Sequence, residues 1–151
     1  MSSDDFFASR ILLVDDQPAN LRLLEELLAR EGFSNVVSTT ESEQVLDIYN
    51  AFDPDLIVLD LMMPGLSGYA VLERIERQRQ ADEFRPVLVL TADATSQAKH
   101  RALALGAKDF LTKPFDAVEA MLRVWNLLET RHLYKRLKRL IPDALELPVR
   151  R

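Results

Sequence analysis

The sequence predicts an α/β fold in which a doubly wound, five-stranded parallel sheet is covered by helices on both faces. Two observations predict it. Short apolar runs without polar alternation recur along the chain, which is typical of strands buried on both faces. Each run is followed by a segment whose apolar residues have helical spacing, and a regular alternation of strands and helices calls for parallel strands joined by right-handed crossovers.

The first strand and helix follow a polar segment, residues 1–8, which we expect to be a flexible lead-in. Arg10–Val14 is the first apolar strand. Asn20–Glu31 is predicted to be a helix, because Pro18 suits a helix start and Gly32 suits a C-terminal cap. Leucines recur at helical spacing within it: Leu21, Leu24, Leu27 and Leu28.

The middle of the chain supplies the next two strands and helices. Val36–Thr39 is a short strand, and Ser42–Phe52 is a helix with Val45, Leu46, Ile48 and Tyr49 turned inward. Leu56–Asp60 begins with four consecutive aliphatic residues and is predicted to be the central strand. Gly68–Gln80 is a helix with inward Tyr69, Val71, Leu72 and Ile75. Its charged residues are expected on a solvated face: Glu73, Arg74, Glu76, Arg77 and Arg79.

The last two strands are predicted at Pro86–Leu90 and Lys108–Leu111, with a weaker helix over Ser96–Leu105 between them. A segment without Gly or Pro then runs from Asp116, a candidate N-cap, to Leu140. This segment is longer than a domain helix needs.

The long C-terminal helix is predicted to change its role along its length. Its first half offers a packing stripe of Val118, Met121, Leu122, Trp125 and Leu128, and its second half has Leu133, Leu137 and Leu140 among basic residues. We therefore predict one domain over residues 9–128. Residues 129–151 would be a connector that is either a short coiled coil forming a homodimer or an interdomain link ending in a linker stub.

The composition limits the classes of function. The 151 residues suffice for one domain with a core and a modest extension. A net charge of −5 and a pI near 5.1 argue against binding to nucleic acid. Cysteine is absent, no apolar run is long enough to cross a bilayer, and MSSDDFFASR lacks the bases of a signal peptide. We expect a cytoplasmic protein that does not enter the membrane.

Polar side chains follow four of the five predicted strands. Asp15 and Asp16 follow the first, Asp60 ends the third, Thr91 follows the fourth and Lys113 follows the fifth. The carboxyl ends of the strands share one edge of a doubly wound sheet, so these groups should converge. Three neighbouring carboxylates need a compensating cation, and an all-oxygen cluster suits Mg²⁺.

Such a site can carry out attack by a carboxylate on phosphorus, which gives an aspartyl phosphate. Phosphoryl transfer asks a protein mainly for positioning and charge neutralisation. Asp60 is the best nucleophile, because the adjacent Asp15 and Asp16 suit a shared metal cradle. Lys113 would hold a phosphate oxygen and Thr91 would donate a hydrogen bond to another.

Four motifs together resemble the signature of the receiver domain of two-component response regulators, over about residues 9–128. They are Val14-Asp15-Asp16, the stretch Leu59 to Pro64 with Gly68, Thr91-Ala92, and Lys113-Pro114-Phe115. The resemblance implies a flavodoxin-like fold with strand order 2-1-3-4-5. It also implies a phosphohistidine on a sensor histidine kinase or phosphotransfer protein as the phosphodonor. The implied site comprises Asp60 as phosphoacceptor, Asp15, Asp16 and Asp60 as Mg²⁺ ligands with the Met62 backbone carbonyl, Thr91 as switch hydroxyl and Lys113 as phosphate contact.

The same resemblance implies a conformational switch. Phosphate on Asp60 would draw Thr91 toward it, and Phe110 would turn into the vacated space. The face made by the fourth helix, fifth strand and fifth helix would then change partners, and this face is the alternative to the C-terminal helix as the surface of a homodimer. Met62 and Asp93 lie where the family tunes dephosphorylation, and because a thioether orients water poorly, we expect a long-lived phosphoryl state.

Three alternatives stay open from the sequence. A phosphatase of the haloacid dehalogenase type also uses an Asp nucleophile with Mg²⁺ and Lys, but it needs a second Asp two residues on, where this chain has Met62. We therefore expect no turnover enzyme. A flavodoxin-like cofactor binder would need a phosphate loop after the first strand, and Asp15-Asp16-Gln17-Pro18 is not one. A pseudo-receiver would act by protein contacts alone.

The output of the domain is less well determined by the sequence. Residues 126–133 are similar to the connector helix of regulators with a downstream cyclic-di-GMP enzyme, either a diguanylate cyclase or an HD-type phosphodiesterase. His100 and His132 are expected at the surface, without a role in phosphotransfer.

Overall fold

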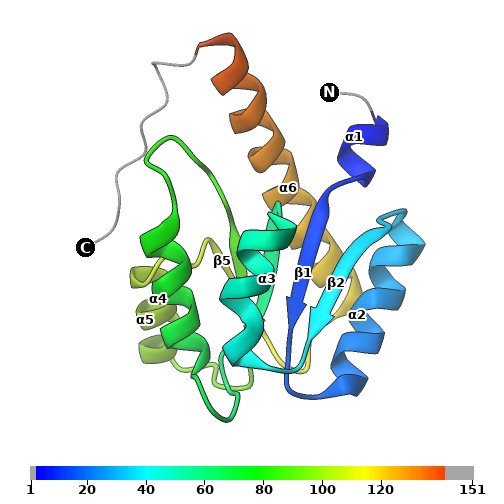
Figure 1. Cartoon of the computed structure of the whole chain (residues 1–151). Coiled ribbons are helices and arrows are strands. Elements are labelled where there is room, and N and C mark those ends of the chain that lie inside the picture. The colour runs from blue at the N-terminus through cyan, green and yellow to red at the C-terminus, as the bar shows by residue number, and fades with distance from the viewer. Residues whose placement is uncertain (1–2, 142–151) are drawn as a thin grey trace.

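The computed structural model describes residues 3–141 and contains one parallel sheet (Figure 1). Its strand order is β2-β1-β3-β4-β5, which confirms the predicted fold. The elements in chain order are α1 (Ser3–Phe7), β1 (Arg10–Val14), α2 (Pro18–Glu31), β2 (Asn35–Thr39), the 3₁₀ turn η1 (Ser42–Gln44), α3 (Val45–Phe52), β3 (Leu56–Asp60), α4 (Gly68–Gln78), β4 (Val87–Thr91), α5 (Ser96–Ala104), β5 (Asp109–Thr112) and α6 (Ala117–Leu140).

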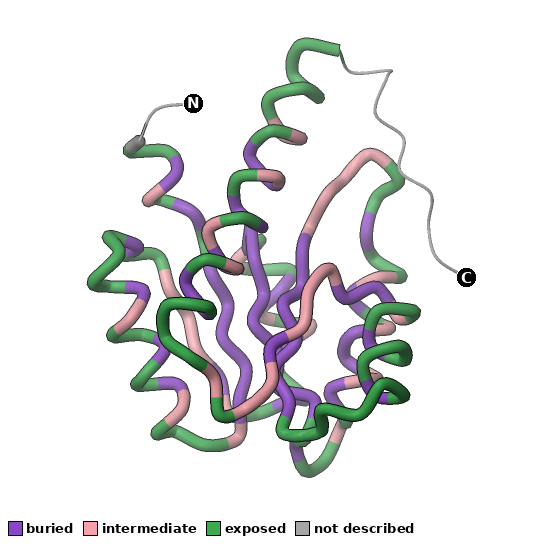
Figure 2. The backbone as a smooth tube through the Cα atoms, turned by 180° about the vertical axis from the view of Figure 1, so that it is seen from behind, coloured by how far each residue is buried: buried purple, intermediate pink, exposed green. Residues whose placement is uncertain are grey.

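Helices cover both faces of the sheet, with α2 and α6 on one side and α3, α4 and α5 on the other (Figure 1). Alternate residues of each strand enter opposite cores. In β1, Ile11 and Leu13 join the core under α2 and α6, whereas Leu12 and Val14 join the other. All residues of β3 and β4 are buried, as Figure 2 shows at the centre of the molecule. This double burial explains the unbroken apolar runs of the sequence.

The strand ends agree with the prediction to within one residue, and β1 and β3 agree at both ends.

The prediction was wrong for Arg79, which is only 7% exposed rather than solvated. Helix α4 ends at Gln78, and the Arg79 guanidinium turns back to donate to the backbone carbonyls of Gln80 and Glu83. It also pairs with Glu76 at 3.2 Å. These acceptors offset the free-energy cost of burying the Arg79 guanidinium.

The N-terminal segment forms a short helix instead of the expected flexible lead-in. Helix α1 places Phe6 in the core at 5% exposure, and its ring centroid lies 4.5 Å from that of Trp125 in α6. Phe6 is therefore anchored on α6 although it lies in the segment that the sequence placed before the domain.

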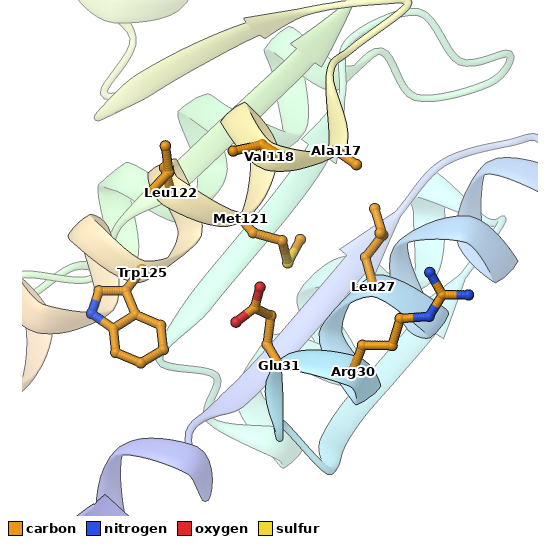
Figure 3. Close-up of a pocket in the computed structure, with 8 residues that line it drawn as sticks. All are labelled: Leu27, Arg30, Glu31, Ala117, Val118, Met121, Leu122 and Trp125. Carbon is orange, nitrogen blue, oxygen red and sulfur yellow. The ribbon is translucent and has the colours of Figure 1, made fainter.

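Helix α6 begins as predicted, and Met121, Trp125 and Leu128 of the predicted stripe pack on the core, but Val118 and Leu122 do not. The Asp116 side chain accepts from the Val118 N–H as its N-cap. Val118 and Leu122, predicted to be packed, are 67% and 58% exposed. Both line a groove of about 270 Å³ between α2 and α6, into which Met121 points (Figure 3). The buried residues of the helix are Ala120, Met121, Val124, Leu127, Leu128, Arg131 and His132.

The packing of α6 continues beyond the predicted domain boundary at residue 128. His132, expected at the surface, is 8% exposed, whereas His100 on α5 is exposed as predicted. Leu133, Leu137 and Leu140 lie on the exposed side of the helix. No helix among residues 3–141, α6 included, is long and apolar enough to cross a membrane.

Candidate functional site

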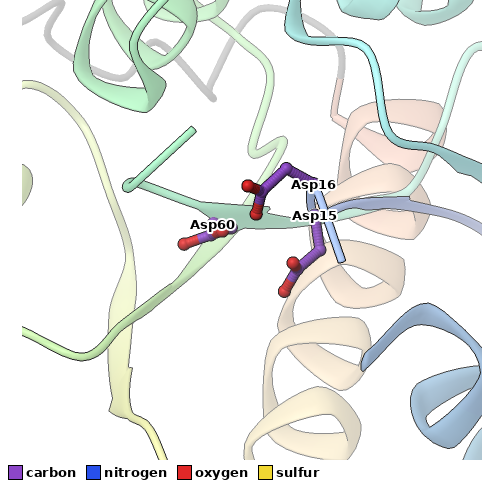
Figure 4. A group of neighbouring side chains, drawn as sticks. All are labelled: Asp15, Asp16 and Asp60. Carbon is purple, nitrogen blue, oxygen red and sulfur yellow. The ribbon is translucent and has the colours of Figure 1, made fainter. Parts of the chain in front are cut away.

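Three carboxylates meet at the carboxyl edge of the sheet, as Figure 4 shows. Strands β1 and β3 are neighbours with Val14 opposite Leu59, so the residues that follow, Asp15 and Asp60, lie beside each other. Asp16 comes next in the chain. One carboxylate oxygen from each of the three lies within 4.8 Å of the other two. The structure thus brings together the three acids that the sequence placed at one edge.

Asp15 is held by three donors. Its side chain is fully buried, and its Oδ1 accepts from the Gln17 N–H at 2.9 Å. Its Oδ2 accepts from Lys113 Nζ at 2.8 Å and from Asn20 Nδ2 at 3.3 Å. Donors from three different residues fix the direction of this buried carboxyl group.

Lys113 lies between the two buried acids. Its Nζ is 2.8 Å from Asp15 Oδ2 and 3.5 Å from Asp60 Oδ2. Its backbone N–H donates to the Thr91 carbonyl at 2.8 Å, which ties the end of β5 to the end of β4. One ammonium therefore contacts two of the three acids of the cluster, so the acids outnumber the cation.

Asp60 has the most perturbed carboxyl in the cluster. It is 2% exposed, and burial raises its pKa from 3.8 to about 6. The Met62 N–H, which donates to Asp60 Oδ1 at 3.0 Å, and the Lys113 ammonium both act to lower the pKa, whereas the charges of Asp15 and Asp16 raise it further. The negative charge of ionised Asp60 is therefore unfavourable in the folded protein until a cation binds or the carboxylate forms a new bond.

Thr91 closes the site from β4. It is fully buried, and its Oγ1 accepts from the Asp93 N–H at 3.1 Å, which leaves its own proton for another acceptor. The Met62 side chain is 60% exposed, and Asp93 is also exposed. Phe110 is not part of the cluster: it is half-buried on β5, and Lys99 of α5 lies 5.5 Å from its ring centroid.

The donor set fits a divalent cation. All three convergent side chains offer carboxylate oxygens, which is the chemistry that Mg²⁺ prefers, and their negative excess needs a cation. Asp15, Asp16 and Asp60 are the residues that would hold it.

Sequence reasoning missed Asn20. Its amide donates to Asp15 Oδ2 and to Gln17 Oε1, both at 3.3 Å, so it orients the acid from the first turn of α2. The available signal was its position one helical turn after the acidic pair, where a side chain reaches back to the strand end.

The sequence pattern of the response regulator receiver domain matches residues 11–124 of this chain. The chain is 35% identical over 114 residues to the transcriptional regulatory protein YvrH of Bacillus subtilis, covering 76% of this chain and 46% of that protein. It is 37% identical over 115 residues to the cell cycle response regulator CtrA of Brucella ovis, covering 76% and 48%. The chain therefore spans about half the length of the curated relatives that it matches.

Solved structures give the same picture. A response regulator structure from Chloroflexus aurantiacus superposes with a TM-score of 0.73 at 33% identity, covering 80% of this chain and 98% of that one. The structure of NtrX from Brucella abortus superposes with a TM-score of 0.78 at 30% identity, covering 88% of this chain but 29% of that chain.

Proposed function

Because this chain belongs to the response regulator receiver domain family, we propose that Asp60 accepts a phosphoryl group from a phosphohistidine on a sensor histidine kinase or phosphotransfer protein. The observation that supports it most is the geometry of Asp60, a buried acid at the end of the central strand with Asp15 and Asp16 alongside and Lys113 within 3.5 Å. Its raised pKa marks a poorly solvated carboxylate, which is a stronger nucleophile toward phosphorus than an exposed one.

The transfer needs few groups. One Asp60 oxygen attacks phosphorus, the P–N bond of the donor breaks, and the imidazole takes up a proton as it leaves. Lys113 moves from its pair with Asp15 toward a phosphoryl oxygen, and the free Thr91 proton is donated to another. Bound Mg²⁺, held by Asp15, Asp16, Asp60 and the Met62 carbonyl, would supply the remaining charge neutralisation.

The switch that we propose runs from Thr91 to the face formed by α5, β5 and α6. When Thr91 moves to the phosphoryl group, Phe110 turns inward from its half-buried position beside Lys99. Met62 offers no group that positions a water, so the phosphorylated state is long-lived.

We propose that α6 carries the signal from the receiver to its output. The matched region covers only about half of the curated relatives, so in a longer protein of that kind α6 would connect the receiver to a further domain, for which a cyclic-di-GMP enzyme is our candidate. The exposed Leu133, Leu137 and Leu140 would allow the same helix to form a homodimer. No nucleic acid or membrane contact is assigned to this chain, and a cytoplasmic location fits a kinase as donor.

Incubation with Mg²⁺ and acetyl phosphate, followed by intact mass spectrometry, tests the phosphoacceptor. We expect one added phosphoryl group, its loss in Asp60→Asn, and its retention in Asp47→Asn, which removes an exposed acid on α3. Light scattering on the same samples reports the oligomeric state.

Two results would contradict the proposal. Modification that persists in Asp60→Asn would place the acceptor elsewhere, and no modification from any phosphodonor would make the chain a pseudo-receiver. Steady release of phosphate at many turnovers would instead favour the phosphatase.

A further inference from the structure

The inward face of α6 is a continuous stripe whose chemistry changes halfway along the helix. Residues spaced alternately four and three apart lie on one side of a helix. In α6 this stripe is Met121, Val124, Leu128, Arg131, Lys135 and Lys138. Its first three residues are apolar and pack on the sheet, and its last three are cationic. The helix therefore does not leave the domain after Leu128, because its packing face only changes from apolar to charged.

Acidic residues meet this cationic half at the amino edge of the sheet. Asp55, directly before β3, is 4% exposed, and its Oδ1 lies 3.2 Å from Arg131 Nε and 3.3 Å from Lys135 Nζ. Its Oδ2 accepts from the Arg10 N–H at 2.9 Å, so the acid is fixed at the start of β1. One turn further along the helix, Lys138 pairs with Asp82 at 2.6 Å. The Asp55–Arg131 pair is buried and multiply bonded, so it holds its geometry better than the exposed Lys138–Asp82 pair.

Helix α1 closes over the same part of α6. The Phe6 ring packs on Trp125 at 4.5 Å and on His132 at 5.9 Å between ring centroids. Ser9, 1% exposed, donates its hydroxyl proton to the Phe6 carbonyl at 2.5 Å. Its oxygen is then left to accept from His132 Nε2–H, 2.7 Å away. Helix α6 is thus contacted on two sides, by the Asp55 carboxylate and by the segment from Phe6 to Ser9.

We propose that this clasp, made of Asp55 and the segment from Phe6 to Ser9, is a releasable latch that fixes the direction in which α6 leaves the receiver. Figure 1 shows α1 and the last turns of α6 at the end of the sheet opposite the carboxylate cluster. The clasp and the phosphoacceptor occupy the two ends of β3, five residues apart, and share no side chain. Loss of either side of the clasp should therefore loosen residues 131–140 more than it loosens the strands. This inference does not depend on phosphorylation of Asp60.

Hydrogen–deuterium exchange of the unphosphorylated chain tests the clasp. In Asp55→Asn, which keeps an acceptor for Arg10 but loses the charge, amides of residues 131–140 should exchange at least about tenfold faster, with β1, β3 and β4 unchanged. The matched control is Asp53→Asn, two residues away: Asp53 is exposed, pairs with Arg10 and Arg85, and has a φ of 53° that Asn tolerates. It should leave α6 protected.

A second variant acts from the other side of the helix. Phe6→Ala should accelerate the same amides and, because Trp125 is the only tryptophan of the chain, shift its emission to the red and increase quenching by acrylamide. Wild-type protection of residues 131–140 in both variants overturns the proposal. Acceleration spread equally over the strands overturns it too, because α6 would then be part of one cooperative core.

Discussion

Asp60 is a residue whose ionisation opposes folding when no cation is bound. Its pKa is raised in the folded protein, so the unfolded chain releases this proton more readily and the native state loses stability as the pH rises through about 6. Asp60→Asn removes the charge and keeps the acceptor for the Met62 N–H. In EDTA at pH 7.5, we expect the free energy of unfolding to rise by about 1–3 kcal/mol, measured by urea denaturation.

Magnesium should reduce the stability difference between wild type and Asp60→Asn. Mg²⁺ stabilises a protein that binds it only when folded, and the wild type keeps all three carboxylates. The gap between wild type and Asp60→Asn should therefore narrow as Mg²⁺ is added, whereas the exposed Asp93→Asn should behave as wild type throughout. A variant less stable than wild type in EDTA would show that ionised Asp60 is fully compensated by Lys113.

At the scale of elements, the start of α4 is fixed by a close approach that only glycine allows. A Cβ on Gly68 would lie 2.4 Å from Leu61 Cα and 2.6 Å from the Asp60 carbonyl oxygen. Gly68→Ala must push α4 away from the end of β3, and we expect it to cost roughly 3 kcal/mol by thermal or urea unfolding. Phosphorylation of Asp60 should slow, because the Asp60 backbone moves with the strand end.

Replacing the neighbouring Ser67 provides a reference against which the destabilisation by Gly68→Ala can be compared. Its side chain caps α4 by accepting from the Ala70 N–H at 3.2 Å, so Ser67→Ala should cost about 1 kcal/mol without disturbing Asp60. If Gly68→Ala is no more destabilising than Ser67→Ala, the helix has room to shift and the close approach is not what fixes it.

Helix α6 shows why an element can be predicted while its packing is not. Its length and N-cap follow from local signals, namely Asp116 and a run without Gly or Pro. Its inward face does not follow from local signals, because Arg131 and Lys135 turn toward the sheet to meet Asp55, about eighty residues earlier in the chain, and Arg131 also donates to the Phe84 carbonyl. A cation on a helix is normally solvated, so nothing local distinguishes these two from Arg136, which is exposed.

Over the whole molecule, the strands and the carboxylate cluster were predictable for the same reason. Parallel strands buried on both faces leave unbroken apolar runs, and their carboxyl ends share one edge, so knowing the strands also locates Asp15, Asp60 and Lys113. Helix α1 was not predictable, because its five residues have too few contacts of their own and, apart from Phe7, the rings around Phe6 come from residues distant in sequence, Phe33, Trp125 and His132.

Two groups at opposite edges of the sheet, His132 and Asp60, together set how the stability of the molecule depends on pH. Burial lowers the pKa of His132 from 6.5; Asp55 and Asp5 act to raise it, and Lys135 and Arg131 to lower it. Since the folded pKa lies below the unfolded one, the unfolded state takes up this proton first, and His132 costs stability as the pH falls through 6.5. Asp60 contributes in the opposite direction in the same range, because its folded pKa is raised.

The contribution of His132 is therefore measurable only when Asp60 does not titrate. In an Asp60→Asn background without Mg²⁺, the free energy of unfolding should fall between pH 7 and pH 5.5. His132→Gln, whose amide can still donate to Ser9, should make that fall shallower. Urea unfolding of both variants at each pH gives the comparison, and His100→Gln, on an exposed histidine, should leave the slope unchanged. Equal slopes with His132 and with Gln would mean that the imidazole keeps its usual pKa inside the clasp, because Asp55 and Asp5 then offset its burial in full.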